Sequence, residues 1–564
     1  MKINEMLLNF KPKLFITLKN YTKDKFIADL MAGLIVGIVA LPLAIAFGIA
    51  SGVSPEQGLI TAIIGGFIVS FLGGSNVQIG GPTGAFIIVV FGIVANPELG
   101  ISGLAIATII AGIMLMLMGF LKLGTVIKFI PYPIITGFTS GIALIIFSTQ
   151  INDLLGLSID KMPGDFISKW EIYFKNMGNI NLVAAGLSFL SILLIIITPK
   201  FLKKIPGSLV AILVVTVITY LLKNYANISE ITTIGDKFPD LSASIKFTGF
   251  ELPSMEKINQ LLPSAFTIAM LGGIESLLSA TVADGVVGDS HNSNTELIAQ
   301  GAANIAVPFF GGIPVTGAIA RTMTNINNGG RSPVAGIVHA VVLLLIMLFL
   351  VPLAKYIPMA CLAGVLVIVS YNMSEWRTFR SLVRNSKSDA TVLITTFFVT
   401  TIFDLTIAIE IGLLLAMLLF MRRMIEVSNV SVTTDILDLS QEKEIYREEE
   451  KLALKKGVEV YEIDGPFFFG IANKFDAYMK VIGDKPKVRI IRMRKVPFMD
   501  STGLRNLEIL YRLSKAEGIV IVLSGVNERV RQMLVTSGLS KKIGEENICD
   551  HISKAVEKGN SYIK

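Results

Sequence analysis

Long apolar stretches, separated by short polar ones, run along most of the chain. Apolar runs recur between Leu30 and Leu418, each near the length of about 20 residues that a helix needs to cross a bilayer. With two shorter segments described below, they make about fourteen segments, in two groups of seven over residues 29–223 and 261–424. The pattern predicts a polytopic α-helical domain over residues 29–424, embedded in a lipid bilayer.

A similar phrase occurs twice, as GGPTGA at residues 80–85 and as GGIPVTGA at residues 311–318. Each copy leads into a short segment that suits a helix, and proline fits the first turn of one. We therefore expect the backbone to break and restart as a helix inside the membrane, where irregular backbone lines a cavity. Interrupted segments at matching places of two halves indicate a transporter binding site, and helix N-termini favour an anion. The alternative is two ordinary loops, which the repetition and the flanking apolar runs disfavour.

An odd number of segments per half places the two halves in opposite orientation, which is an inverted repeat. Lysine and arginine are concentrated in alternate loops, as the positive-inside rule requires of cytoplasmic loops. The acidic loops, 152–181 and 224–260, then lie outside, and both termini are cytoplasmic, including the basic segment 1–28. We expect a multi-pass protein of the cell membrane. The loops predicted to lie inside contain Lys122 and Lys128; Lys200, Lys203 and Lys204; Arg331; Arg377 to Lys387; and Arg422 and Arg423.

Composition narrows the function further. Only 16% of the residues are charged and 52% are hydrophobic, whereas soluble domains contain about 25% charged residues. The net charge of +7 is spread over loops and tail rather than gathered in an arm that would bind nucleic acid. Two cysteines, Cys361 and Cys549, and three histidines exclude a Cys-based or His-rich metal site. Without a nucleophile–base pair or a nucleotide loop, we expect neither an enzyme nor a cofactor.

The composition changes after Arg423. Residues 425–456 form a polar, charged linker, and strand-like runs then alternate with helix-like ones, including an expected helix over residues 474–481. This alternation predicts a small soluble α/β domain over residues 457–558.

The ordered motifs make the chain similar to bacterial members of the SulP/SLC26 (sulfate permease-like) anion transporters over nearly its whole length. The resemblance implies a seven-plus-seven inverted repeat with a UraA/SLC26-like core and gate, a C-terminal STAS domain, and transport by an elevator movement in a homodimer. It also implies an anion bound between the two half-helices, flanked by the first and eighth spans. The motifs are LPLAIAFG from Leu41, GPTG from Gly81, GIESLL from Gly273, HNSNTEL from His291, Gly311 to Arg321, and DSTGL from Asp500.

Glu275 is the strongest candidate for a functional residue. A carboxylate inside an apolar membrane span is energetically costly, so its presence indicates a functional role. Burial favours its neutral form, so a proton on Glu275 would remove its repulsion of an anion and allow proton–anion symport. The alternative is a structural carboxylate that caps a neighbouring helix. Sodium-coupled bicarbonate relatives resemble this site but carry aspartate with hydroxyls nearby. Here Ile319 stands where we expect a hydroxyl, which favours a proton over sodium.

The expected substrate is a small anion such as sulfate, bicarbonate or a dicarboxylate. Arg321 could add positive field or pair with Glu275, or form a purely structural ion pair. Leu43 stands where relatives carry a polar residue, which implies a more apolar site. An uncoupled channel or exchanger, a sodium-coupled bicarbonate transporter and a STAS-linked membrane sensor remain alternatives. The expected substrate-binding residues are Thr83, Gly84, Ser276, Gly317, Ala318 and Ile319.

Two hydroxyls in the tail form a candidate regulatory site. Ser501 and Thr502 match the turn that is phosphorylated in bacterial STAS regulators, and a phosphate is favoured at a helix N-terminus. In transporters of this family the same turn is often unused, so a merely structural turn is the alternative.

Overall fold

The computed structural model places two compact units, residues 1–416 and 417–564, each of which is described by itself. The helix expected over residues 474–481, and Lys128, Lys203 and Lys204, lie outside the described residues. The structure describes residues 10–127, 131–159, 162–163, 165–202, 206–225, 230–239, 247, 254–403, 405–427, 429–433, 436–438, 451–468 and 486–563.

The first unit is helical, and the predicted polytopic fold is confirmed. Within the described residues, nine helical stretches are long and apolar enough to cross a membrane, and five further segments complete the fourteen. The segments of the first half are α3 (Lys23–Ala50), α4 (Pro55–Ile60) continued through a π turn into α5 (Gly66–Leu72), α6 (Ile87–Val94), α7 (Gly100–Phe120), α9 (Tyr132–Leu155), α11 (Leu182–Phe201) and α12 (Gly207–Tyr225); those of the second half are α14 (Met255–Val287), α15 (Ser293–Ala306), α16 (Ile319–Asn327), α17 (Pro333–Ala354), α18 (Met359–Met373), α20 (Lys387–Ile402) and α21 (Leu405–Val427).

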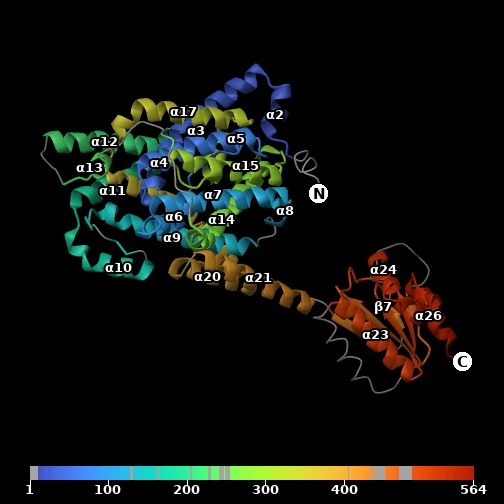
Figure 1. Cartoon of the computed structure of the whole chain (residues 1–564). Helices are drawn as coiled ribbons and strands as arrows, with labels where there is room; N and C mark the ends of the chain where they lie inside the picture. Colours follow the sequence, from blue (N-terminus) through green and yellow to red (C-terminus); the bar gives the residue numbers. More distant parts are fainter. Residues whose placement is uncertain are drawn as a thin grey trace. The chain divides into compact units, whose positions relative to one another are not determined.

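The two halves pack crosswise. The first segment of each half lies against the fourth of the other, α3 against α17 and α14 against α7. The second segments follow the same rule, α5 against α17 and α15 against α7, and Figure 1 shows α3, α5, α15 and α17 side by side. Such exchanged contacts are what an inverted repeat produces, because each half completes the apolar surface of the other.

The helices divide into a core and a gate. The core contains α3 to α7 and α14 to α17, which pack on one another as described above. The gate is built around α9 and α18, which pack together, with α20 against α9 and α11 and α12 against α18. Gly412 of α21 lies against Thr396 of α20 and Ile134 of α9. The cavity described below lies where α3, α14 and the half-helices of the core face α9 and α18 of the gate.

Two short helices occupy regions that the sequence predicted as loops. α10 (Phe166–Lys175) lies in the acidic loop, and α19 (Trp376–Asn385) lies in the basic one. Both are amphipathic and too short to span the membrane. In the sequence, their many polar residues favoured a loop over the weaker helical periodicity. On α19 the apolar residues Trp376, Phe379 and Val383 repeat at helical spacing.

Buried Asp29 ties the start of α3 to the turn before α17. Its carboxylate is fully buried and accepts hydrogen bonds from the Tyr21 hydroxyl (2.7 Å), the Arg331 amide (2.8 Å), the Ser332 amide (3.2 Å) and the Ser332 hydroxyl (2.5 Å). Buried donors without an acceptor are costly, so this carboxylate fixes where α3 begins relative to α17.

We expect Asp29→Ala to lower the free energy of unfolding by about 3 kcal/mol, because it leaves several donors unpaired and buried. Thermal unfolding of the detergent-purified protein measures the change. Asp24→Ala is the matched control, since Asp24 is an exposed carboxylate in the first turn of the same helix. Equal midpoints for the two variants would contradict a structural role for Asp29.

The second unit is an α/β domain around a five-stranded sheet of order β3-β6-β7-β8-β9. The strands β6 to β9 are parallel and β3 is antiparallel. Side chains alternate along each strand, so one face packs on α23, α24 and α25 and the other on α26; Figure 1 shows α23 and α26 beside the sheet. The bounds are β3 (Asn429–Thr433), β6 (Val458–Asp464), β7 (Val488–Arg492), α23 (Ser501–Ala516), β8 (Val520–Ser524), α24 (Glu528–Thr536), α25 (Leu539–Ile543), β9 (Ile548–Cys549) and α26 (Ile552–Ser561), with a separate pair β4 (Ile436–Asp438) and β5 (Lys451–Ala453).

Candidate functional site

The two interrupted segments meet. Strand β1 (Gly80–Gly81) pairs antiparallel with β2 (Thr316–Gly317), with Gly80 opposite Gly317 and Gly81 opposite Thr316. The Ala318 amide extends the ladder by donating to the Ile79 carbonyl at 3.0 Å. The chain turns helical at Gly84 in the first copy and at Ile319 in the second. The expectation that the two half-helix starts lie together is therefore confirmed.

A buried carboxylate that the sequence analysis missed fixes the approach to β1. Glu296 is fully buried and accepts from the amides of Gly74 (2.8 Å) and Ser75 (3.2 Å). It also accepts from the side-chain amides of Gln78 (2.9 Å) and Gln300 (2.8 Å). The apolar run that starts at Leu297 would place Glu296 just outside a membrane span, whereas α15 already begins at Ser293. The signal available in the sequence for this buried carboxylate was its position directly before a long apolar run.

Arg321 crosses from α16 to the other half-helix. Its guanidinium is 2% exposed and donates to the carbonyls of Gly80, at 3.5 Å, and Pro82. It forms no ion pair with Glu275 among the contacts of the described residues. A Cβ at Gly81 would collide with this guanidinium, so glycine is required there for the close approach of the two segments. Arg321 therefore binds the two half-helix starts together.

Glu275 and Thr83 form the polar centre of the site. Glu275 lies inside α14, and the Thr83 hydroxyl donates to its Oε2 at 2.9 Å. Thr83 is the residue before the first half-helix and is 6% exposed. A hydroxyl has one proton, so in this arrangement Thr83 spends its only donor on the carboxylate.

Both residues face a cavity of about 410 Å³ between core and gate. Gly84, Ala318, Ile319 and Arg321 line it as well. Its other walls are mainly apolar and include Leu43 and Phe47 of α3 and Ile274 of α14. Polar side chains are a minority of the lining and come from both core and gate, among them Thr139, Asn372 and Glu375, and a mainly apolar lining with some polar groups is usual for a small-ligand site.

Three of the expected binding residues do not offer the cavity the hydrogen-bonding groups that were predicted. The Ala318 amide is already bonded to Ile79, so this N–H is not free for an anion. Gly317 lies within β2, opposite Gly80, rather than among the residues that line the cavity. Ser276 points away from it and donates to the Gly273 carbonyl of its own helix at 3.1 Å. One residue along a helix rotates the side chain by about 100°, which separates Ser276 from Glu275.

The hydroxyls of Ser279 and Thr322, near the half-helices, form hydrogen bonds within the protein. Ser279 donates to Thr322 at 3.2 Å, and Thr322 accepts from the Ile79 amide at 3.1 Å. In the described part of the chain, no group of three or more histidine, cysteine or acidic side chains is placed to hold a metal ion.

Ser501 and Thr502 form the exposed first turn of α23. Asp500 caps this helix by accepting from the Gly503 amide at 2.7 Å. The placement suits a phosphate electrostatically, although the Asp500 carboxylate beside it would repel one. Phosphorylation of this turn stays a prediction.

Sequence comparison matches residues 26–396 to the sulfate permease family and residues 451–557 to the STAS domain. The chain belongs to the sulfate permease family. Its relatives in this family are transporters, and nothing in the comparison indicates a catalytic activity. The family resemblance seen in the sequence is therefore confirmed, and the chain is a multi-pass member of an anion-transporter family.

Relatives in the sulfate permease family match along nearly their whole length. The Bacillus subtilis protein named "Putative sulfate transporter YvdB" is 40% identical over 540 residues, which cover 94% of this chain and 98% of that one. The bicarbonate transporter BicA of a Picosynechococcus species is 31% identical over 533 residues, 91% of each chain.

Solved structures of the family share the fold. SLC26A9 aligns with 100% of this chain and 94% of its own, with a TM-score of 0.85 at 19% identity. The transmembrane domain of a cyanobacterial BicA aligns with 70% of this chain and 98% of its own, with a TM-score of 0.61 at 29% identity.

Proposed function

We propose that this protein is a secondary transporter that moves a small oxyanion or carboxylate anion, of the sulfate, bicarbonate or dicarboxylate class, together with a proton. The observation that carries the proposal is the Glu275–Thr83 pair, which faces the cavity at the point where two half-helices begin side by side. The N-termini supply partial positive charge for the anion. Glu275 supplies a titratable group next to it.

The Thr83 hydroxyl couples the two ligands in this proposal. When Glu275 is ionised, the single hydroxyl proton of Thr83 is directed at the carboxylate, and the negative charge repels an entering anion. When Glu275 is protonated, its own O–H donates to Thr83. The Thr83 proton then becomes available to the anion, and the repulsion disappears. Protonation and anion binding therefore favour each other, which is the thermodynamic requirement for symport.

The mini-sheet supports movement of the site as one piece. Because β1 and β2 bond to each other, and Arg321 of one half-helix bonds to the approach of the other, the anion-binding parts belong to a single rigid core. The gate contributes only lining residues such as Thr139 and Met373. This arrangement supports the elevator movement of the core against the gate that we include in the proposal, with a homodimer and cytoplasmic termini as its further parts. The Glu275 site offers few oxygen ligands for a sodium ion. Among the described residues, Thr83 is the only one whose hydroxyl is hydrogen-bonded to Glu275.

Uptake into proteoliposomes tests the function. The purified full chain is reconstituted, and labelled sulfate, bicarbonate and succinate are offered separately, with an inward proton gradient, with an inward sodium gradient and with neither. We expect concentrative uptake of at least one anion with the proton gradient alone. Uptake driven only by sodium, or conductance far above carrier turnover, would overturn the proton-coupled proposal in favour of a sodium symporter or a channel.

Thr83→Val provides a sharper test at the same site, because valine keeps the shape and removes the hydroxyl. We expect proton-driven uptake to fall by about tenfold to a hundredfold, the effect of losing a hydrogen bond to a charged group. Thr83→Ser keeps the hydroxyl and is expected to retain most of the activity. Equal rates for the valine and serine variants would show that the hydroxyl has no part in transport.

A further inference from the structure

A second cavity, of about 440 Å³, lies between α9, α18, α19 and α20. It occupies the opposite side of the α9–α18 pair from the central cavity. On α18, Val369 and Met373 line the central cavity whereas Val367 and Tyr371, on the opposite face of the helix, line the second one. The α9–α18 pair is therefore a wall shared by the two cavities.

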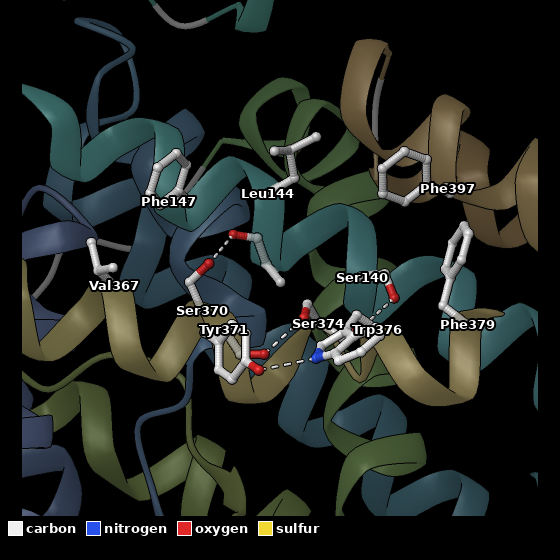
Figure 2. A pocket seen from close by; sticks show the side chains of 11 residues that line it. Ser140, Leu144, Phe147, Val367, Ser370, Tyr371, Ser374, Trp376, Phe379 and Phe397 are labelled. Atoms are coloured by element: carbon white, nitrogen blue, oxygen red, sulfur yellow. Dashed lines mark hydrogen bonds between the residues drawn. The ribbon is translucent and has the colours of Figure 1, made fainter. Parts of the chain in front are cut away.

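The second cavity presents hydrocarbon and aromatic surface. Figure 2 shows the side chains of Leu144 and Val367 and the rings of Phe147, Phe379 and Phe397 around it. Phe379 and Phe397 meet edge to face, with ring centroids 5.5 Å apart. Such a surface suits an acyl chain better than a polar solute.

The polar side chains of this cavity are already paired. The Ser140 hydroxyl donates to the Ser374 carbonyl at 2.7 Å, and the Ser370 hydroxyl to the Ala143 carbonyl at 2.5 Å, so both fasten α9 to α18. The Trp376 indole N–H donates to the Tyr371 hydroxyl at 3.1 Å. At the edge of the cavity, Tyr371 and Trp376 stay 58% and 44% exposed, as aromatic residues do at the level of lipid headgroups.

Positive charge stands beside the opening. Arg377, Arg380 and Arg384 are exposed and follow one face of α19 at spacings of three and four residues. Arg377 lies over the Trp376 ring, with its Cζ 5.4 Å from the ring centroid, and within the described part of the chain none of the three arginines forms an ion pair with an acidic side chain. Guanidinium groups bind phosphate oxygens through paired N–H donors, so the phosphate of a lipid complements this face.

We propose that the second cavity is a binding site for an anionic phospholipid. One acyl chain lies among Leu144, Phe147, Val367 and Phe397, and the headgroup phosphate contacts the arginines of α19. Under the positive-inside rule, α19 lies on the cytoplasmic side, where anionic lipids attract basic juxtamembrane segments. Because the chain occupies the back of the wall that lines the anion cavity, the lipid is placed to restrain the movement of α9 and α18.

Fluorescence of Trp376 tests the site. The chain has two tryptophans, so a Trp170→Phe variant reports on Trp376 alone. This variant is reconstituted in phosphatidylcholine vesicles containing a small fraction of either phosphatidylglycerol or phosphatidylcholine with brominated acyl chains, which quench tryptophan on contact. We expect brominated phosphatidylglycerol to give the same quenching as brominated phosphatidylcholine at a lower fraction of the lipid. This fraction should be lower by about fivefold for each arginine that contacts the headgroup. Equal quenching by the two lipids would overturn the proposal.

Two variants separate the site from general membrane electrostatics. Removing Arg377, Arg380 and Arg384 together is expected to make the two lipids quench equally. Removing Lys122, Arg422 and Arg423 deletes the same number of cytoplasmic positive charges and is expected to leave the preference intact. If both triple variants lose the preference to the same degree, only the net charge attracts the lipid, and the site is disproved.

A second measurement does not depend on Trp170→Phe. Lipid that remains bound to detergent-purified protein is extracted and its headgroups are identified by mass spectrometry. We expect phosphatidylglycerol to be enriched over phosphatidylcholine with the natural chain and depleted with Val367→Phe, which fills the cavity. Val341→Phe, at a position of α17 that is 47% exposed, is the size-matched control. Added inorganic phosphate that displaces the lipid would indicate a simple anion site instead.

Discussion

Replacing Glu275 by glutamine is expected to abolish proton-driven accumulation while leaving exchange of anion across the membrane. Glutamine keeps the shape and can still accept from Thr83, but it cannot bind or release a proton. In the natural chain, each pH unit across the membrane can support up to about tenfold accumulation per proton carried. The variant is expected to equilibrate its anion to a ratio near one at every imposed gradient. We expect uptake by the natural chain to rise as the medium becomes more acidic, and this dependence to disappear in the variant.

The measurement is a time course of labelled anion in proteoliposomes at several imposed pH differences, together with counterflow at equal pH. Glu256→Gln is the matched control, since Glu256 is an exposed glutamate in the first turn of the same helix. Full pH-dependent accumulation in Glu275→Gln would remove the proton role from this residue. Loss of counterflow as well would instead identify Glu275 as a residue needed to form the site.

The second large effect is expected from Gly81→Ala. The added methyl group collides with the Arg321 guanidinium at the centre of the site. Overpacking of this kind costs about 1–3 kcal/mol, and here the strain falls on the hydrogen bonds from Arg321 to Gly80 and Pro82. We expect uptake to fall by about tenfold or more, since about 1.4 kcal/mol corresponds to tenfold in an equilibrium.

Two comparisons test the cause. Gly92→Ala alters a glycine of α6, the half-helix that follows Gly81, where nothing lies within 4 Å of an added Cβ, and is expected to keep uptake and stability. The thermal unfolding midpoint of Gly81→Ala should recover partly in an Arg321→Ala background, because the two changes share one contact and their effects are not additive. Additive losses of stability would show that the collision with Arg321 is not the reason.

The membrane fold could be predicted from the sequence because lipid makes the pattern strict. Every span must be apolar over a nearly fixed length, and the phrases GGPTGA and GGIPVTGA mark where the backbone was expected to be irregular inside the membrane. Glu275 was found for the same reason, since it interrupts an apolar run. The amphipathic α19 was missed because its arginines, at spacings of three and four, read as a basic loop.

The finer geometry could not be predicted, because it depends on contacts between segments far apart in the chain. Nothing in the sequence near Ala318 indicates that its amide bonds to Ile79, 239 positions away, as the strand pairing requires. The direction of the Arg321 side chain was equally hidden, since both a carboxylate and backbone carbonyls were available partners. The apolar run suggests a helix that starts at Leu297, four residues after the observed start of α15 at Ser293, so Glu296 fell outside the predicted span.

The short ladder between Gly80–Gly81 and Thr316–Gly317 has a consequence for the direction of transport. A pocket whose halves are bonded to one another keeps the same shape whichever side of the membrane it faces. If the core moves as the proposed elevator, we expect a similar dissociation constant from either side and transport in either direction. Whether a cell gains or loses the anion is decided by the gradients it maintains, and in proteoliposomes inversion of the gradient should turn import into export at a matching rate.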